Sequence, residues 1–372
     1  MIKIAVIGTR GLPARYSGIE ASVEAMARRL DPLQYQLVVY CRRSVQESPG
    51  DELPRAVRRR YTPTINTKNF GAFFHALIST VHAMCGDVDI VHFHALGPAM
   101  FAFLPRLTGK ISIVTIHALD WKRKKWGRMA RAVLKWCEYP AVFFPHRTIV
   151  VAKAMQQYFE QKYHRPLTYI PNGVELPARE CPDDPRDLYG RYILFVGRLV
   201  PEKGIQYLIQ AFNELAPEVK LLIAGEPSFT AEYADGLKRM AGPKVVFLGF
   251  MQGTALRSLY AHAELFVLPS EVEGLSVSVL EAMSYGRCVL ASDVPECREV
   301  IGDAGVTFKS KDAADLREKL RFLLQNPDTA RQIGLRGRQR VEREYNWDTI
   351  MKTVEDTYQS ALRESKGARC AR

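Results

Sequence analysis

Short runs of apolar residues alternate along the chain with longer stretches in which apolar residues recur every three or four positions. The first run, IKIAVIG, is followed by a loop and then by the periodic stretch IEASVEAMARRL. Continuous apolar, β-branched runs are typical of strands buried on both faces, and the longer period is typical of amphipathic helices. The alternation therefore predicts an α/β fold built on parallel, doubly wound sheets.

The alternation is interrupted around residues 166–190, where the sequence RPLTYIPNGVELPARECPDDPRD contains five prolines and predicts a linker. Strand-like runs then resume with YILFVG, VKLLIAG, VVFLGF, AELFVLP and RCVLAS. A chain of 372 residues is also long for a single hydrophobic core. We therefore expect an N-terminal domain over residues 1–174, a second domain over 175–345, and a C-terminal helix over 346–366 that packs back on the first.

Residues that directly follow the predicted strands are the candidates for chemistry, because ligands of open α/β sheets bind beyond the carboxyl ends of the strands. In LFVGRLVPEKG, Arg198 follows a strand and Lys203 stands where the next helix begins. A cation at a helix N-terminus is mildly unfavourable unless an anion binds there as well. The pair is suited to holding a diphosphate. The alternative interpretation is two solvated surface cations.

The stretch ELFVLPSEVEGLSVSVLEAM predicts a strand, a loop and a helix, with one acid on the loop and another in the helix. Glu273 on the loop could accept hydrogen bonds from sugar hydroxyls, and Glu281, about one turn into the helix, from a ribose. Two other interpretations remain: a structural capping box formed by Glu281 with Ser278, and a glycosidase pair of acids. Between the two acids, Gly274 would permit a ligand to approach the backbone closely. The amides of Leu275 and Ser276, near the helix start, could then bind phosphate oxygens.

GRLVPEKG, followed by two glutamates with seven residues between them and by EGLS and VLEAM, resembles the family-4 retaining glycosyltransferases of the GT-B fold over nearly the whole chain. The resemblance implies two Rossmann-like domains facing across a cleft. It implies that Arg198 and Lys203 hold the diphosphate of a nucleotide-sugar donor, that Glu273 contacts the donor sugar, and that Glu281 contacts the ribose. It further implies no obligatory metal or other cofactor.

The first half of the chain supplies a loop, GTRGLPARYSG, whose glycines do not have the G-x-G-x-x-G spacing of dinucleotide-binding proteins. With PTINTKN and LDWKRKKWGR, this loop resembles a bacterial subgroup of rhamnosyltransferase-like enzymes of polysaccharide synthesis. The resemblance implies that Gly11 approaches the donor diphosphate and that Arg15 and Tyr16 lie on the acceptor side. His117, directly after ISIVTI, matches a donor-sugar ligand of the wider family, although the subgroup would be expected to have aspartate there. A purely structural histidine is the alternative.

Residues 121–136, WKRKKWGRMARAVLKW, contain seven cations, no acid and three of the four tryptophans. Basic residues with tryptophans suit an anionic membrane surface. A helix packed on its own domain with a solvated basic face is the alternative, and no nucleic-acid-binding module accompanies the charge. We predict Lys124, Trp126 and Arg128 on the acceptor or membrane side. In a helix, one stripe would be Lys124, Arg128, Arg131 and Lys135, and another Trp126, Ala130, Val133 and Cys137.

Composition limits the partners and the cellular compartment that can be expected for this chain. The net charge of +12 predicts anionic partners. Seven cysteines without a Cys-x-x-Cys pair argue against disulfides and zinc and favour a reducing cytoplasm. Neither a signal peptide nor a membrane-spanning run is expected, which leaves a cytoplasmic protein with peripheral binding at the inner membrane face as an option. His92, His94 and the Asp-x-Asp at 87–89 are predicted to be structural, with no metal.

The sequence thus predicts a retaining glycosyltransferase that moves a hexose or deoxyhexose from a nucleotide diphosphate sugar to a glycan, expected to be lipid-linked, in cell-surface polysaccharide synthesis. Two alternatives remain. A nucleotide-sugar epimerase or hydrolase of the same fold would need no acceptor. A non-catalytic, basic membrane-binding protein would need none of the donor residues.

Overall fold

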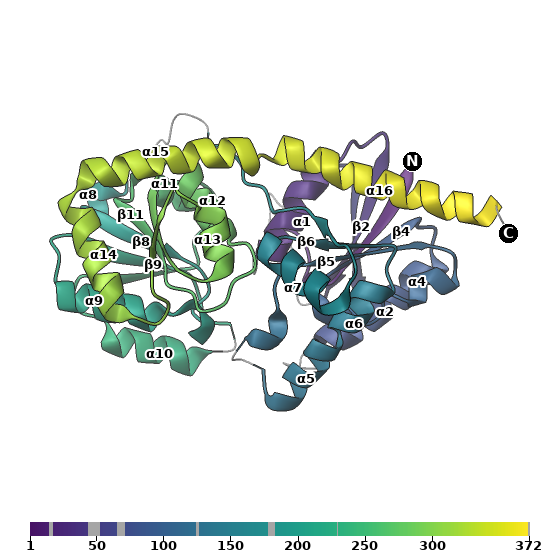
Figure 1. The fold of residues 1–372 in the computed structure, drawn as a ribbon, viewed down its shortest axis with the longest axis horizontal. Coiled ribbons are helices and arrows are strands. Elements are labelled where there is room, and N and C mark those ends of the chain that lie inside the picture. The colour runs from purple at the N-terminus through teal and green to yellow at the C-terminus, as the bar shows by residue number, and fades with distance from the viewer. Residues whose placement is uncertain are drawn as a thin grey trace. The chain divides into compact units, whose positions relative to one another are not determined.

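The computed structural model describes residues 1–14, 18–43, 53–64, 71–123, 126–177, 183–228 and 230–370, with side chains up to residue 365. Arg15, Tyr16 and Lys124, three of the predicted site residues, lie outside the described residues. The chain divides into two compact units (Figure 1). Unit 1 comprises Met1–Asn172 and Asp348–Arg372, and unit 2 comprises Gly173–Trp347.

Unit 1 contains a parallel sheet in which the described strands follow the order β3-β2-β1-β4-β5-β6-β7. The central strands are buried along their whole length or nearly so, as continuous apolar sequence requires. The edge strand β3 has the sequence VRRRYT and alternates buried and exposed positions. The strands are β1 (Ile2–Ile7), β2 (Tyr35–Arg42), β3 (Val57–Thr62), β4 (Ile90–His94), β5 (Ile111–Ile116), β6 (Arg147–Val150) and β7 (Thr168–Tyr169).

The helices of unit 1 connect these strands, as parallel neighbours require. They are α1 (Gly18–Arg29), α2 (Gly71–Cys85), α3 (Leu96–Ala99), α4 (Leu104–Leu107), the 3₁₀ turn η1 (Asp120–Lys122), α5 (Arg128–Trp136), α6 (Glu138–Phe143) and α7 (Lys153–Tyr163). The final helix, α16 (Trp347–Cys370), joins them from the other end of the chain and is drawn in yellow in Figure 1. Its buried Tyr358 reaches Met26 of α1, and Gln359 donates to the Tyr35 hydroxyl on β2.

Unit 2 contains a second parallel sheet, in the order β10-β9-β8-β11-β12-β13. Its strands are β8 (Tyr192–Val196), β9 (Lys220–Ala224), β10 (Val245–Gly249), β11 (Leu265–Leu268), β12 (Cys288–Ser292) and β13 (Val306–Phe308). Its helices are α8 (Arg186–Tyr189), η2 (Pro201–Lys203), α9 (Ile205–Leu215), α10 (Ala231–Met240), α11 (Gly253–His262), α12 (Val277–Ser284), α13 (Pro295–Ile301), α14 (Ala313–Gln325) and α15 (Pro327–Glu344).

Two parallel α/β sheets confirm the predicted fold class. Two local expectations were wrong. The segment predicted to be only a linker, residues 166–190, supplies β7, which pairs with β6, and the short helix α8. The region 121–136, considered as a single basic helix, is divided between η1 and α5, with residues 124 and 125 between them not described.

Candidate functional site

In unit 2, the loops that follow β8 and β11 lie against each other. The amide of Glu271 donates to the carbonyl oxygen of Glu202 at 2.8 Å. Gly204 makes the approach possible: its φ is +65°, and a Cβ atom there would lie 2.1 Å from the carbonyl oxygen of Pro269. The glycine of the PEKG sequence is therefore required where these two chain segments meet.

This loop contact brings together Lys203 and Glu273, two predicted site residues that are 70 positions apart. Lys203 Nζ donates to Glu273 Oε1 at 2.5 Å, and the two side chains are only 15% and 9% exposed. A largely buried ion pair depends on both members, because removing one leaves the other charge uncompensated. The pair also leaves two ammonium protons and one carboxylate oxygen for other partners. It can therefore bind an anion and a hydroxyl group side by side.

The loop after β11 continues directly into α12. Gly274, Leu275 and Ser276 are buried, and Ser276 is the N-cap residue of the helix. The Ser276 side chain makes no capping hydrogen bond; its Oγ lies 3.1 Å from Ser278 Oγ instead. The first amides of α12 therefore receive no side-chain cap, and an anion would suit them. Arg198, half-buried, lies two residues beyond β8.

Glu281 is the fifth residue of α12, as the predicted helix start implied, but it forms no capping box with Ser278, so that interpretation was wrong. Its Oε2 accepts a hydrogen bond of 2.8 Å from the hydroxyl of the buried Tyr260. The surrounding protein desolvates the carboxyl group and raises its pKa to about 7; Tyr260 opposes this shift and Glu175 adds to it. The carboxyl thus changes charge near neutral pH.

Glu202 is a feature that the sequence reasoning missed. It is buried, and within the described part of the chain neither of its carboxylate oxygens has a hydrogen-bond partner. Buried polar groups nearly always have partners, so an isolated carboxylate is a candidate acceptor for a bound ligand. The sequence argument considered cations at the start of a helix. It therefore selected Lys203 and passed over the acid next to it, Glu202.

In unit 1, the predicted His117 belongs to a cluster of three buried histidines at the ends of β4 and β5. Its Nε2 lies 2.9 Å from Nδ1 of His94, and the His94 ring is tilted against that of His92, with centroids 4.3 Å apart. Gly8, at the end of β1, has φ +117°, and a Cβ atom there would lie 2.1 Å from the His94 carbonyl oxygen. The glycine after the first strand thus allows β1 and β4 to end close together.

His92 extends the cluster to the C-terminal helix. Its Nδ1 lies 2.8 Å from the Tyr358 hydroxyl and its Nε2 lies 2.7 Å from Thr115 Oγ1. Both nitrogens are thus satisfied, as a structural role requires. In contrast, His94 Nε2 and His117 Nδ1 are buried and have no hydrogen-bond partner among the described residues. These two nitrogens are candidates for contact with a ligand.

Burial keeps all three imidazoles neutral. It lowers the pKa of His92 and of His117 to about 3, with His117 and Arg123 respectively adding smaller repulsions, and it holds the pKa of His94 well below its usual value. At neutral pH the cluster therefore offers hydrogen bonds without charge. The prediction treated His92 and His94 alike as structural, but His94 differs from His92 in its contact with His117 and in its Nε2, which has no partner among the described residues.

Comparison with known proteins identifies the enzyme class. The family described as Glycosyltransferase Family 4 matches residues 16–177, and Glycosyl transferases group 1 matches residues 184–340. The structure of sucrose-phosphate synthase from Thermosynechococcus elongatus superposes with a TM-score of 0.83 at 21% identity, covering 98% of this chain and 100% of that one. The chain is a glycosyltransferase of the GT-B fold.

Curated relatives of this glycosyltransferase share about a quarter of its residues. Alpha-maltose-1-phosphate synthase from Mycobacterium tuberculosis is 28% identical over 87% of this chain and 93% of that protein. The sulfoquinovosyl transferase SQD2 from Arabidopsis thaliana is 33% identical, but over 45% of this chain and 33% of that protein. Among solved structures, Anabaena HepE in complex with UDP and glucose has a TM-score of 0.79 at 16% identity, covering 97% of this chain and 100% of that one. The narrower rhamnosyltransferase-like subgroup stays a prediction.

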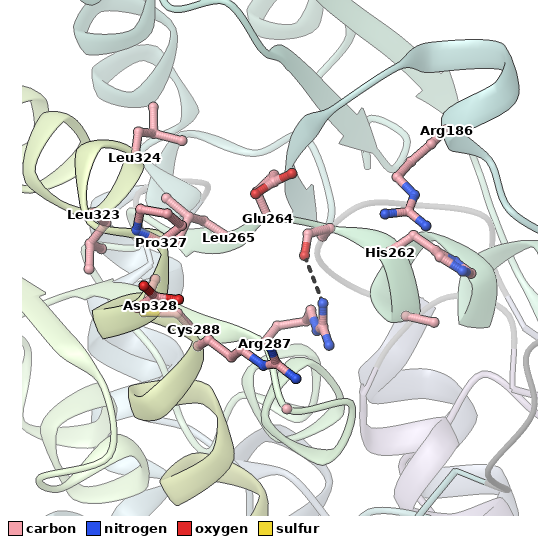
Figure 2. Close-up of a pocket in the computed structure, with 15 residues that line it drawn as sticks. Arg186, His262, Glu264, Leu265, Arg287, Cys288, Leu323, Leu324, Pro327 and Asp328 are labelled. Atoms are coloured by element: carbon pink, nitrogen blue, oxygen red, sulfur yellow. Dashed lines mark hydrogen bonds between the residues drawn. The ribbon is translucent and has the colours of Figure 1, made fainter.

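A pocket of about 540 Å³ in unit 2 of the glycosyltransferase does not coincide with the predicted donor residues (Figure 2). It is lined by Leu265 and Cys288, the first residues of β11 and β12, whereas the predicted donor residues follow the other ends of the strands. Its charges are mixed, since the same lining contains Arg186 and Arg287 as well as Glu264 and Asp328. The pocket therefore gives no support to a second donor site.

The predicted basic region of the glycosyltransferase is described in part. Trp126 is half-buried, and Arg128, the first residue of α5, is exposed. The residues of the stripe with Trp126 differ in exposure: Val133 is exposed, Ala130 is half-buried and Cys137 is buried, while Leu134, outside that stripe, is half-buried. In the described part of the chain, no helix has the length and apolar character needed to span a bilayer.

Proposed function

We propose that this glycosyltransferase moves a hexose or deoxyhexose from a nucleotide diphosphate sugar to a glycan acceptor with retention of configuration and without a metal ion. The Lys203–Glu273 pair carries the proposal, since one cation and one acid beside the start of α12 suit a sugar diphosphate. Related structures support the donor class: HepE was solved with UDP and glucose, and the catalytic domain of starch synthase IV from Arabidopsis thaliana with ADP and acarbose.

Charge stabilisation accounts for the chemistry in this proposal. As the bond from the sugar to the diphosphate breaks, negative charge grows on the departing phosphate. Arg198, Lys203 and the amides of Leu275 and Ser276 would stabilise that charge, in place of a metal ion. Gly274 would allow the backbone of unit 2 to approach these phosphates, and Gly11 is the donor-binding residue that we propose in unit 1. The acceptor hydroxyl would then attack the anomeric carbon from the face that the diphosphate leaves and pass its proton to the departing phosphate oxygen, so that the configuration at the sugar would be retained.

Hydroxyl recognition would fall to the acids and the neutral histidine. The free oxygen of Glu273 would accept from the donor sugar, and Glu281 would accept from the ribose. His117 would bond a sugar hydroxyl through Nδ1, the nitrogen without a partner in the described residues. His94, 2.9 Å from the other His117 nitrogen, would fix the orientation and tautomer of that ring.

For the acceptor, we propose a lipid-linked glycan and a role in cell-surface polysaccharide synthesis, at the cytoplasmic membrane surface. Two observations support this step: the net charge of +12, and the exposed basic residues of α5. Arg15, Tyr16, Lys124, Trp126 and Arg128 would serve the acceptor or membrane side. A nucleotide-sugar epimerase or hydrolase of the same fold would have no use for such a surface.

The donor test is thermal unfolding of the full chain with UDP, dTDP, GDP and ADP at equal concentrations, each with and without EDTA. A ligand that binds only the folded protein stabilises it by about 2.7 kcal/mol at one hundred times its dissociation constant. We expect one diphosphate to raise the melting temperature selectively and EDTA to leave that increase unchanged. No increase with any diphosphate would refute the proposed donor class, and an increase abolished by EDTA would refute metal independence.

The nucleotide sugar chosen by that test is then incubated with the enzyme, first alone and then with a lipid-linked glycan. We expect transfer only in the second reaction, with the anomeric configuration of the new bond, measured by NMR, equal to that of the donor. Free sugar or an epimer formed at an equal rate from the donor alone would favour the hydrolase or epimerase alternative.

A further inference from the structure

Exposed apolar side chains are concentrated in one part of unit 1. Among the described residues, nine of the seventeen exposed large apolar side chains lie between Phe73 and Tyr139. They belong to α2, to the region of α4, and to α5 and α6. The nine are Phe73, Phe74, Val81, Phe103, Leu107, Met129, Val133, Trp136 and Tyr139. Such a concentration indicates an interaction surface.

Helix α5 presents the most apolar part of this surface. No residue of α5 is buried. The face with Ala130 and Leu134 is half-buried and is therefore the one directed toward the protein. Met129, Val133 and Trp136, which share a face of the helix at 100° per residue, are 83%, 45% and 57% exposed. An amphipathic helix normally buries its apolar stripe, and α5 leaves this one in solvent.

Cations occupy the adjoining face of the same helix. Arg128, Arg131 and Lys135, at spacings of three and four residues, are all exposed. Lys122 of η1 is exposed as well, and its Nζ lies 5.8 Å from the centroid of the Trp121 ring. The flanking acids do little to reduce this charge at the surface, because Asp120 is paired with Arg123 at 3.2 Å and Glu138 is buried.

A hydrogen-bond network holds η1 and the start of α6 in place on either side of α5. Trp121 Nε1 donates to Glu138 Oε1 at 2.6 Å. The same buried carboxylate accepts from Lys162 at 2.5 Å and from Tyr163 at 2.9 Å, both on α7. Lys135 of α5 also lies over Trp121, 5.2 Å from the ring centroid. The segments on either side of α5 are therefore anchored to the protein, and the apolar face of this helix remains exposed.

Aromatic contacts extend the surface from α6 to α4. The Tyr139 ring lies 6.0 Å from that of Phe144, and Phe144 lies 5.8 Å from Phe103, which precedes α4. Leu107, at the end of α4, is exposed beyond them. Helix α5 also contacts α6 directly, as Figure 1 shows within unit 1. The aromatic side chains from Tyr139 to Phe103 thus lie in contact with one another, on and beside the helix that α5 packs against.

We propose that α5, with α6 and the Phe103–Leu107 segment, is a docking surface for an anionic lipid bilayer. Met129, Val133 and Trp136 would insert among the headgroups while Arg128, Arg131 and Lys135 bind lipid phosphates. Charge complementarity favours an anionic bilayer over a second copy of this chain, because a second copy would place the same positively charged face against this one. The inference deepens the proposed function, because a lipid-linked acceptor lies at a bilayer surface, but vesicle binding does not require catalysis.

The test is co-sedimentation of the full chain with vesicles of phosphatidylcholine alone and with 30% phosphatidylglycerol. We expect binding to the anionic vesicles, weakened by salt. The variant Met129→Ser with Trp136→Ser should bind at least tenfold more weakly. Replacing Arg131 and Lys135 by Gln should cost about fivefold for each cation removed. As a matched control, Phe322→Ser with Leu335→Ser removes exposed apolar side chains from unit 2 and should leave binding unchanged.

Several outcomes would overturn the inference: no binding to anionic vesicles, equal binding by the α5 variants, or equal loss in the control. A change of oligomeric state in the Met129→Ser, Trp136→Ser variant without any vesicle binding would show that the surface binds a second copy instead. The diphosphate-induced rise in melting temperature is measured on every variant. An intact rise with lost vesicle binding supports both ideas, whereas vesicle binding without any rise refutes only the proposed donor site.

Discussion

The two units use their buried polar groups in opposite ways. Unit 2 places charged groups together: Lys203 is paired with Glu273 beside the start of α12. Unit 1 places three imidazoles together, and burial keeps them neutral. A pair of opposite charges suits a diphosphate, while neutral imidazoles suit hydroxyl groups, which need hydrogen bonds and no counter-charge. In our proposal, unit 2 therefore supplies the charge stabilisation and two acids that accept from hydroxyl groups, whereas unit 1 supplies an uncharged hydrogen bond to a sugar hydroxyl.

The contrast also has a pH signature. The histidines have pKa values below those of an unfolded chain, so their contribution to stability is present above about pH 6.5 and is lost as the pH falls. Glu281 has the opposite sign, because its pKa is raised to about 7. Its contribution is complete below about pH 4.5 and is lost as the pH rises through 7. Acid therefore weakens one cluster, and mild alkali weakens the other.

The largest expected effect is on catalysis by the charged cluster. Replacing Lys203 by Ala removes a cation from the departing phosphate, and we expect the rate constant of sugar transfer to fall by about 10²–10³-fold. His117→Ala, its counterpart in the neutral cluster, removes one uncharged hydrogen bond and should lower the rate by about tenfold. Single-turnover rates with saturating donor measure both.

Arg191→Ala is the matched control for Lys203. Arg191 also forms an ion pair, with Glu264 at 2.9 Å, but it is exposed and precedes β8 instead of following it. Its replacement should leave the transfer rate within about twofold, since exposed ion pairs contribute little. Equal rates for Lys203→Ala and wild type would remove the charged cluster from the mechanism, and melting temperatures show whether each variant is folded.

A smaller effect should separate the pH dependence of the units. In Glu281→Gln the side chain still accepts from Tyr260 but no longer titrates. Between pH 4.5 and 8, the wild type should lose up to about 3 kcal/mol of stability relative to this variant, because ionising the carboxyl in its folded surroundings is unfavourable. The difference between the two melting temperatures, measured at pH 5 and pH 8, tests this. A difference that does not change with pH would contradict the raised pKa.

The smallest effect concerns the link between the histidine cluster and α16. Tyr358→Phe leaves Nδ1 of the buried His92 without its partner and should destabilise the protein by about 1–3 kcal/mol. Tyr40→Phe is the control, because Tyr40 has the same 2.8 Å contact to His82, whose ring is at the exposed surface and can bond water instead. We expect a loss below about 1 kcal/mol there. Equal losses of melting temperature would show that burial of His92 adds nothing.

Much of the fold could be predicted because central parallel strands have a local signature. A strand covered on both faces is nearly continuous in apolar residues, as in β8 and β11. Edge strands lack this signature. In β3, Arg58 and Arg60 alternate with less exposed positions, so the segment gave no strand signal, and β7 was concealed in a proline-rich segment.

The candidate site could be predicted as a set of positions but not as a set of contacts. Strand ends, helix starts and the family resemblance singled out Arg198, Lys203, Glu273 and Glu281. The Lys203–Glu273 pair spans 70 residues, and the Tyr260–Glu281 bond spans 21. Neither has a signature in the local pattern, because the sheet order brings these loops and helices together.

The sequence by itself determined two parallel α/β sheets, the positions at which charge follows a strand, and the basic, amphipathic character of residues 121–136. Only the tertiary structure decided which histidine contacts His117 and which stripe of α5 meets solvent. The reason is physical. Periodicity fixes which residues share a face of a helix, but the neighbours on which the helix packs decide which face is covered. Here Ala130 and Leu134 are turned toward the protein, and Met129 and Trp136 remain exposed.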